Sequence, residues 1–138
     1  MRGLRITLRF IGVVQLFFGV LFTFAPTVAG GLLGFAPDAP AWAAWLFVMM
    51  GARFLGYGAG MLVAARDPQR NESWINTMIG IQVIDWVSTM GFLLAGDLPI
   101  TSVLSAVVLP VVFVSALLWW HPRRLAARTT SRPAMAGD

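Results

Sequence analysis

Two charged residues interrupt long apolar stretches and are the first candidates for chemistry. Arg53 lies near the middle of the apolar run 41–64, and Asp85 lies near the middle of the run 74–94. A charge at the centre of a membrane helix costs about 2.5–3.5 kcal/mol on insertion scales, so such residues usually have a function. A short turn joins the two runs, which predicts antiparallel packing with both charges at one depth. Two interpretations remain open: a buried ion pair that fixes helix register, or a site for an anionic headgroup, a quinone carbonyl or a proton.

Other polar residues occur at helical spacings around this pair. Gln82 and Thr89 lie three residues before and four residues after Asp85, so all three share one helix face. Tyr57 follows Arg53 by one turn, and the first apolar stretch carries a glutamine in its middle. We therefore expect one polar core, which is also a hypothetical ligand-binding site, formed by Gln15, Arg53, Tyr57, Gln82, Asp85 and Thr89.

The remaining residue types offer little catalytic machinery. The chain has no cysteine and one histidine, and the sequence contains no recognisable carboxylate cluster for a metal or Ser-His-Asp arrangement. His121 is a remote candidate as a haem or pigment ligand, although a lone histidine at a membrane interface usually anchors its helix. We predict no catalytic and no metal-binding residues, and we favour a role other than catalysis.

The composition identifies lipid as the solvent of this chain. Apolar residues make up 58% and charged residues 12%, whereas a soluble domain carries roughly 25% charged residues. The net charge of +4 does not indicate nucleic acid, because the arginines lie at the chain ends and in one loop rather than on a patch with aromatic residues. The sequence predicts an all-α integral membrane protein whose surroundings are the lipid bilayer.

Four apolar segments are long enough to be considered as membrane spans. They predict a four-transmembrane-helix bundle over residues 1–120, with spans at about 8–25, 41–64, 74–94 and 100–120, and a polar basic C-terminal tail at 121–138. Prolines and the Gly30-Gly31 pair interrupt the connection 25–40, where we expect a short segment at the interface or against the bundle. A secretory signal peptide is the alternative interpretation of the first span, because a basic start precedes it.

Arginine placement predicts the orientation of the bundle. Three arginines lie at the N-terminus, two lie in the loop 65–73, four lie in the tail, and the other two connections have none. Positive charge accumulates on the cytoplasmic side of membrane proteins, so we expect both termini to be cytoplasmic.

Glycines mark the second span as a packing surface. Gly51, Gly56 and Gly60 occur along it, and the last two have the G-x-x-x-G spacing that allows close approach of a neighbouring helix. A phosphate-binding glycine loop would need a preceding strand and polar surroundings, and the sequence indicates neither. We predict helix packing through these three glycines.

Several short motifs occur in an order that resembles small bacterial DoxX-like four-helix membrane proteins. The motifs are Phe24-Ala25-Pro26, the stretch Leu32 to Phe35, Arg53-Phe54-Leu55-Gly56 and Ala65-Arg66-Asp67-Pro68. The resemblance covers roughly residues 5–120. It implies a multi-pass protein of the bacterial cytoplasmic (inner) membrane with a link to membrane redox complexes and quinones, and it transfers no catalytic residue.

These observations lead to three expected functions. The first is a small non-catalytic accessory or structural subunit, which packs with other membrane subunits or with copies of itself. The alternative is a quinone- or lipid-binding protein that uses Arg53 and Asp85. A small transporter or proton carrier is the third, and the lack of an obvious internal repeat disfavours it.

Overall fold

A computed structural model describes residues 2–33, 40–97 and 100–122 of the chain. Within these ranges every regular element is a helix, and the five helices are α1 (Arg2–Phe24), α2 (Pro26–Leu32), α3 (Ala41–Arg66), α4 (Glu72–Ala95) and α5 (Ile100–Trp119). The predicted all-α class is therefore confirmed. The basic tail lies outside the described residues from 123 onwards.

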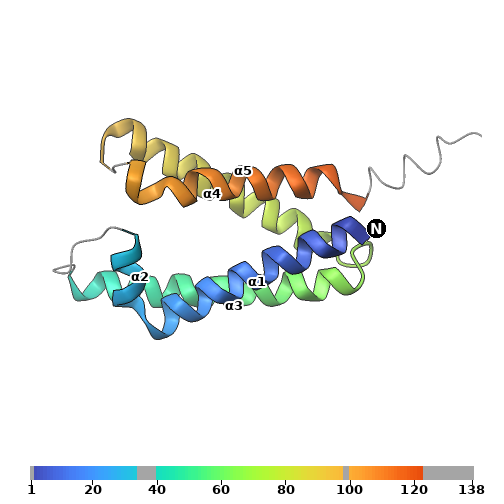
Figure 1. The fold of residues 1–138 in the computed structure, drawn as a ribbon, viewed down its shortest axis with the longest axis horizontal. Helices are drawn as coiled ribbons and strands as arrows, with labels where there is room; N and C mark the ends of the chain where they lie inside the picture. The colour runs from blue at the N-terminus through green and yellow to red at the C-terminus, as the bar shows by residue number, and fades with distance from the viewer. Residues whose placement is uncertain (1, 34–39, 98–99, 123–138) are drawn as a thin grey trace, which may run out of the picture.

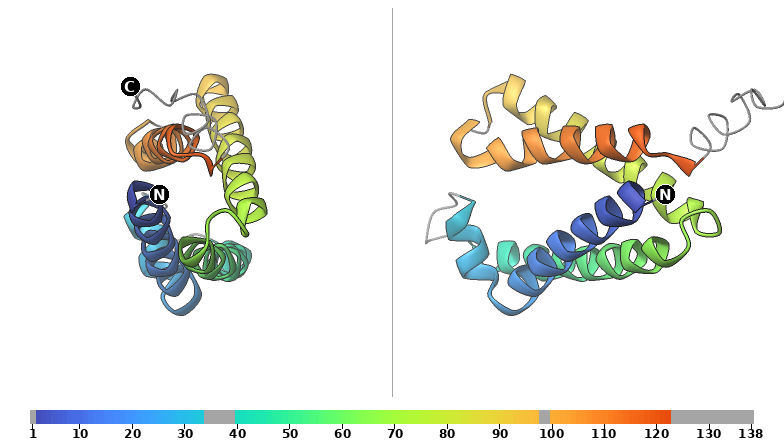
Figure 2. Two further views of the ribbon diagram at one scale, coloured as in Figure 1. Left: turned by 90° about the vertical axis from the view of Figure 1, so that its right-hand side faces the viewer. Right: turned by 45° about the vertical axis from the view of Figure 1, so that its right-hand side comes forward.

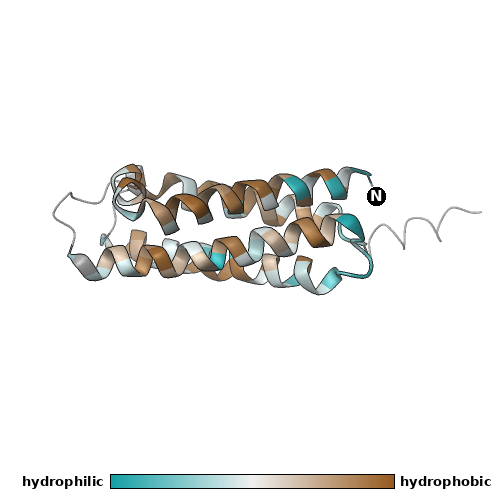
Figure 3. Cartoon of the chain, turned by 90° about the horizontal axis from the view of Figure 1, so that it is seen from below, coloured by the Kyte–Doolittle hydropathy of each residue, from teal (hydrophilic) through white to brown (hydrophobic). Residues whose placement is uncertain are grey.

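Three of these helices are long and apolar enough to cross a membrane, namely α1, α3 and α4. A helix of 24 residues, the length of α4, extends for about 36 Å, which exceeds the ~30 Å hydrocarbon core of a bilayer. The apolar part of α5 is shorter and covers Val103–Trp119. Figure 3 shows that the helices are apolar over most of their length, whereas hydrophilic residues gather at the end near the N-terminus. The three long apolar helices indicate a membrane protein.

The four long helices form two pairs (Figures 1 and 2). Helix α1 packs along α3, and α4 packs along α5, whereas α3 meets α4 over a short stretch only. The turn between α3 and α4 is held by Asn71, whose side-chain amide donates a hydrogen bond of 2.9 Å to the Asp67 carbonyl. The sequence predicted direct packing of run 41–64 against run 74–94. This prediction is wrong over most of the length of α3, because α1 and not α4 packs along it.

A seam of four glycines explains why α3 packs against α1. Gly12 and Gly19 of α1, and Gly51 and Gly58 of α3, are each seven residues apart. In the antiparallel pair Gly12 faces Gly58 and Gly19 faces Gly51, and a Cβ built on Gly51 would lie 2.9 Å from the Gly19 carbonyl oxygen. Real side chains essentially never approach backbone that closely, so the two helix axes can come this near only because these positions lack a side chain.

The three glycines singled out from the sequence have different surroundings. Gly51 belongs to the α1–α3 seam, and Gly60 lies against the indole ring of Trp74 on α4. A Cβ on Gly56 would meet open space. The G-x-x-x-G pair Gly56 and Gly60 therefore does not form one contact face within the chain.

The two helix pairs share a core at one end of the bundle and separate toward the other. Buried residues from all four long helices make the shared core: Leu4, Leu8, Ile11, Met61, Ala64, Ala65, Ile75, Met78, Phe113 and Leu117. A second cluster around Phe22, Ala29 and Phe47 involves α1, α2 and α3 only. The end that carries the N-terminus is thus closed by side chains, and the pairs diverge beyond it (Figure 1).

Helix α2 provides the packing that was expected of the first connection. Pro26 stands at its first position, where a missing N–H costs nothing. A Cβ on Gly30 would lie 3.2 Å from the Phe47 ring, so α2 lies closely against α3. At the other end of the first span, Leu4 and Leu8 are fully buried. Helix α1 is thus an integral part of the shared core.

Candidate functional site: a cavity between the helix pairs

A cavity of about 330 Å³ lies where the two helix pairs separate. Three helices contribute the polar side chains that line it, and all six residues expected to form a polar core are among them: Gln15 from α1, Arg53 and Tyr57 from α3, and Gln82, Asp85 and Thr89 from α4. The helical spacing on each element brings these residues to one place, because each set faces the space between the pairs.

A second cavity of about 290 Å³ shares part of this lining and is mainly apolar. Gln15, Gln82 and Asp85 line both cavities. The apolar walls are formed largely by the rings of Phe18, Phe22, Phe47, Phe54 and Phe113. The combined site therefore has a polar end and an aromatic end, as is typical of pockets for amphiphilic molecules.

Arg53 and Asp85 face the same cavity without forming a direct ion pair. In the part of the chain that the structure describes, the contact between acidic and basic side chains within 4.0 Å is that of Glu72 with His121, which is an ion pair only when the imidazole is protonated. Arg53 and Asp85 are both exposed residues, and both line this cavity. The two residues are thus opposite charges that line one cavity without direct contact, which differs from the buried ion pair that was one of the two interpretations of the sequence.

Two glutamine amides form the wall between the polar cavity and the core. Gln15 and Gln82 are each only 6% exposed. Both direct their Nε2 to the sulfur of Met78, at 3.9 Å and 3.6 Å respectively. A thioether is a weak acceptor, and among the described residues nothing donates to Gln15 Oε1. The two amides therefore donate only to a weak acceptor, and the Gln15 Oε1 acceptor has no partner among the described residues.

The backbone of α4 already uses one of the polar side chains. The Thr89 hydroxyl donates a hydrogen bond of 2.8 Å to the Asp85 carbonyl one turn earlier. Such back-bonding is usual for threonine inside membrane helices. Thr89 therefore contributes its methyl group and an acceptor to the cavity more readily than a donor.

Helix α5 contributes features of the site that the sequence pattern did not single out. Pro110 lies inside α5, and because proline has no N–H, the Ala106 carbonyl lacks its usual donor four residues later. Ala106 lines both cavities. Nearby, the Trp86 indole N–H donates a hydrogen bond of 3.1 Å to the Val107 carbonyl and ties α4 to α5. The sequence signal for this part of the cavity lining was Pro110, because a proline within a helix leaves the carbonyl four residues earlier, here that of Ala106, without its hydrogen bond.

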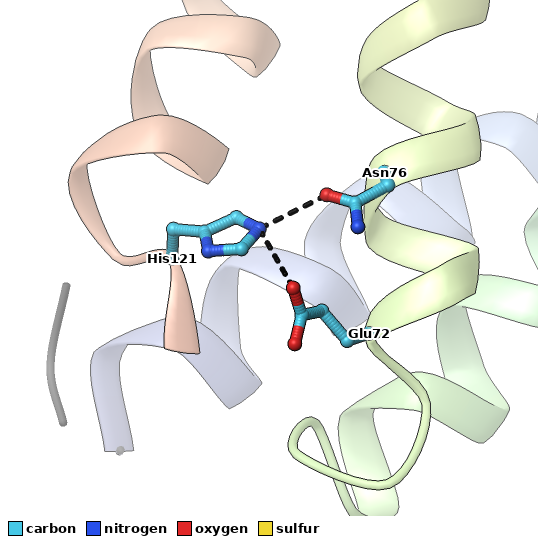
Figure 4. Close-up of polar contacts among 3 residues, drawn as sticks. All are labelled: Glu72, Asn76 and His121. Atoms are coloured by element: carbon cyan, nitrogen blue, oxygen red, sulfur yellow. Dashed lines mark hydrogen bonds and ion pairs between the residues drawn. The ribbon is translucent and has the colours of Figure 1, made fainter. Parts of the chain in front are cut away.

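His121 lies at the closed end of the bundle, away from both cavities. Its Nε2 is 3.0 Å from Asn76 Oδ1 and 3.8 Å from Glu72 Oε1 (Figure 4). A carboxamide oxygen only accepts hydrogen bonds, so Nε2 carries the hydrogen in this contact. The three residues connect the end of α5 to the start of α4. Over the described ranges no group of three or more His, Asp or Glu side chains could hold a metal ion.

Comparison with known proteins gives no independent assignment. No protein-family model, no curated protein and no solved structure matches this chain.

Proposed function

We propose that this protein binds a lipid-soluble amphiphile, a quinone or a lipid, in the cavity between its two helix pairs. The observation that carries the proposal is the joint lining of one cavity by Arg53 and Asp85 beside an aromatic cavity. The polar head of the ligand would lie near the two charges, and its apolar part would lie among the phenylalanine rings. The resemblance to DoxX-like proteins favours a quinone among such ligands.

The energetics of the two charges support a bound polar head. Each charge at this depth in a helix costs a few kcal/mol relative to an apolar residue. A direct ion pair would offset part of that cost, but in the described part of the chain Arg53 and Asp85 do not approach within ion-pair distance. A ligand head that accepts hydrogen bonds from the guanidinium supplies the missing interaction, because hydrogen bonds to charged groups are the strong ones.

The size of the site supports a ligand rather than one or two isolated waters. The polar cavity alone holds about 330 Å³, whereas a water molecule occupies about 30 Å³ in the liquid. The phenylalanine-lined cavity has few groups to which water could bond. An apolar chain or ring of the ligand can contact these phenylalanine rings at little desolvation cost, because the ligand already lies in lipid before it binds.

We further propose four membrane spans, with both termini on the cytoplasmic side of a bacterial inner membrane. Arg2, Arg5, Arg66 and Arg70 lie near the helix ends that meet in the shared core, as does His121. Trp42 and Trp45 are more than half exposed at the opposite end, where an aromatic belt would contact the lipid headgroups. Helix α5 has 20 residues, or about 30 Å, which is enough for the fourth span.

Lipid analysis of purified variants tests the binding proposal. We expect the wild-type protein, extracted in mild detergent, to carry a roughly equimolar amphiphile that mass spectrometry identifies. Arg53→Gln should lose most of this ligand, whereas Arg66→Gln removes a guanidinium from the end of the same helix and should retain it. Equal retention by both variants, or no bound amphiphile in the wild-type protein, would contradict the proposal.

A role as an accessory subunit of a membrane complex is the second candidate, and the outer face of α3 favours it. Ala52, Gly56 and Ala59 are exposed along this face, and a Cβ on Gly56 would meet no atom of the chain. Small residues in this arrangement allow another membrane helix to approach closely. Either a different subunit or a second copy of the chain could supply that helix.

Co-purification tests the second candidate. If α3 docks on a partner, Gly56→Leu should remove a stoichiometric partner that the wild-type protein carries out of native membranes. Gly91→Leu introduces the same side chain at another open helical position, on α4, and should leave the complex intact. A wild-type protein that purifies alone as a monomer would exclude this function.

A further inference from the structure

The strongest unexplained feature of the cavity is the buried amide of Gln15. Its side chain is 6% exposed, its Nε2 reaches only the Met78 sulfur, and Oε1 accepts from nothing in the described part of the chain. A buried acceptor without a donor is unfavourable, because it has lost water and gained nothing. Gln15 lines both cavities, so a ligand placed there lies next to this amide.

The charges of the same cavity restrict the ligand further. Arg53 and Asp85 are the charged residues that line it, and their charges cancel. A head with a net charge would leave one charge uncompensated at a depth where that is costly. A head without net charge, but with an acceptor on one side and a donor on the other, can satisfy both residues at once.

We infer that the ligand has an uncharged head carrying both a hydrogen-bond acceptor and an N–H or O–H donor. Gln15 and Asp85 accept hydrogen bonds from the donor of the head, and Arg53 donates to its acceptor. This inference rests on the proposed function and narrows it: neutral amide- or alcohol-headed amphiphiles bind, and a quinone fits in its reduced quinol form, whose O–H groups donate. Carboxylate, ester and oxidised quinone heads, which lack a donor, are disfavoured. The terminal torsion of a glutamine side chain is broad, so Gln15 can turn Oε1 to the head within its existing rotamer.

Three probes with one polyene chain and different heads test the inference. Parinaramide carries a donor and an acceptor, methyl parinarate carries acceptors only, and parinarate carries a negative charge. Binding to the detergent-solubilised full chain can be followed by energy transfer from the protein's tryptophans to the polyene. Because the chain is constant, differences in affinity report the head alone.

The wild-type protein should bind the amide at least about tenfold more tightly than the ester or the carboxylate, since a site built to receive a hydrogen bond rejects analogues that lack the donor. Gln15→Leu should reduce the preference for amide over ester to about threefold or less. Gln69→Leu makes the same change in an exposed turn and should preserve it. Asp85→Asn leaves Arg53 uncompensated and should improve carboxylate binding.

Two results would overturn the inference while leaving the proposed function standing. They are equal wild-type affinity for amide and ester, and an unchanged preference in a folded Gln15→Leu protein. If Gln15→Leu does not fold, the wild-type comparison and Asp85→Asn still decide the matter. Failure of all three probes to bind would overturn both the inference and the proposed function, with water as the remaining occupant of the polar cavity.

Discussion

Gly12 and Gly58 lie face to face across the α1–α3 interface: a Cβ built on either residue would lie 3.0 Å from the carbonyl oxygen of the other. This reciprocity fixes the register of the two helices. A shift by one residue would bring side chains into the same narrow space. Gln15 lies between Gly12 and Gly19 on α1, and Arg53 lies between Gly51 and Gly58 on α3. The seam therefore also fixes the depth of Gln15 relative to Arg53.

The seam predicts unequal effects of identical substitutions. Gly58→Ala should destabilise the protein by about 1–3 kcal/mol, because the new methyl group meets the Gly12 backbone and the Leu16 side chain. Gly56→Ala points into open space and should be neutral or stabilise by up to about 1 kcal/mol through helix propensity. Thermal unfolding in one detergent, followed by tryptophan fluorescence, compares the two variants. Equal midpoints would show that α1 and α3 do not meet at Gly58.

The contact between His121 and Asn76 should contribute measurably to closing one end of the bundle. A double-mutant cycle with His121→Ala and Asn76→Ala should give a coupling energy of about 1 kcal/mol, the usual value for a hydrogen bond. The same cycle with Asn76→Ala and Trp42→Ala joins residues on separate ends and should give a coupling near zero. A zero result for the first cycle would mean that α5 is not held to α4 through this pair.

The end of α4 depends on a glycine with a left-handed backbone. Gly96 has φ of 81°, and its N–H donates to the Leu93 carbonyl. Gly96→Ala should cost about 1 kcal/mol, because an L side chain is strained in this conformation. Gly91→Ala, inside the helix and facing open space, should stabilise by a similar amount. The sign difference in thermal midpoint is the decisive observation.

Topology can be measured directly because the chain contains no cysteine. With both termini cytoplasmic, Asp97→Cys should react with an impermeant maleimide added to intact spheroplasts. Gln69→Cys, in the turn before α4, should react only after the membrane is permeabilised. The reverse pattern would invert the orientation, and labelling of both positions from outside would exclude an α4 that spans the membrane.

The polar site could be anticipated from sequence because its signals are local. Gln82, Asp85 and Thr89 share a face through helical spacing alone, and Arg53 and Tyr57 do the same one helix earlier. Once each face was assigned to the interior, the six polar residues had only one common place to meet. The structure places all six around one cavity.

The pairing of helices could not be anticipated in the same way. The G-x-x-x-G spacing drew attention to Gly56, whereas the contact uses Gly51 and Gly58, seven residues apart. The seven-residue spacing on α3 predicts a helix contact only when it is matched by Gly12 and Gly19 on α1. The sequence signal for this pairing therefore lies in two segments that are far apart in the chain. The cavity follows from this pairing, because α3 turned toward α1 leaves a space between Arg53 and Asp85.

The glycine seam also determines an order of assembly. It requires nothing beyond the first 66 residues, since the atoms that a Cβ at each of the four glycines would meet belong to α1 and α3. The first helix pair can therefore form in the bilayer while the ribosome is still adding the second. Domains that mature from their N-terminus during synthesis follow the same sequence of events. The late arrival of α4 and α5 would enclose the cavity as the final step of biogenesis, in the presence of whatever membrane lipid already lies against α3.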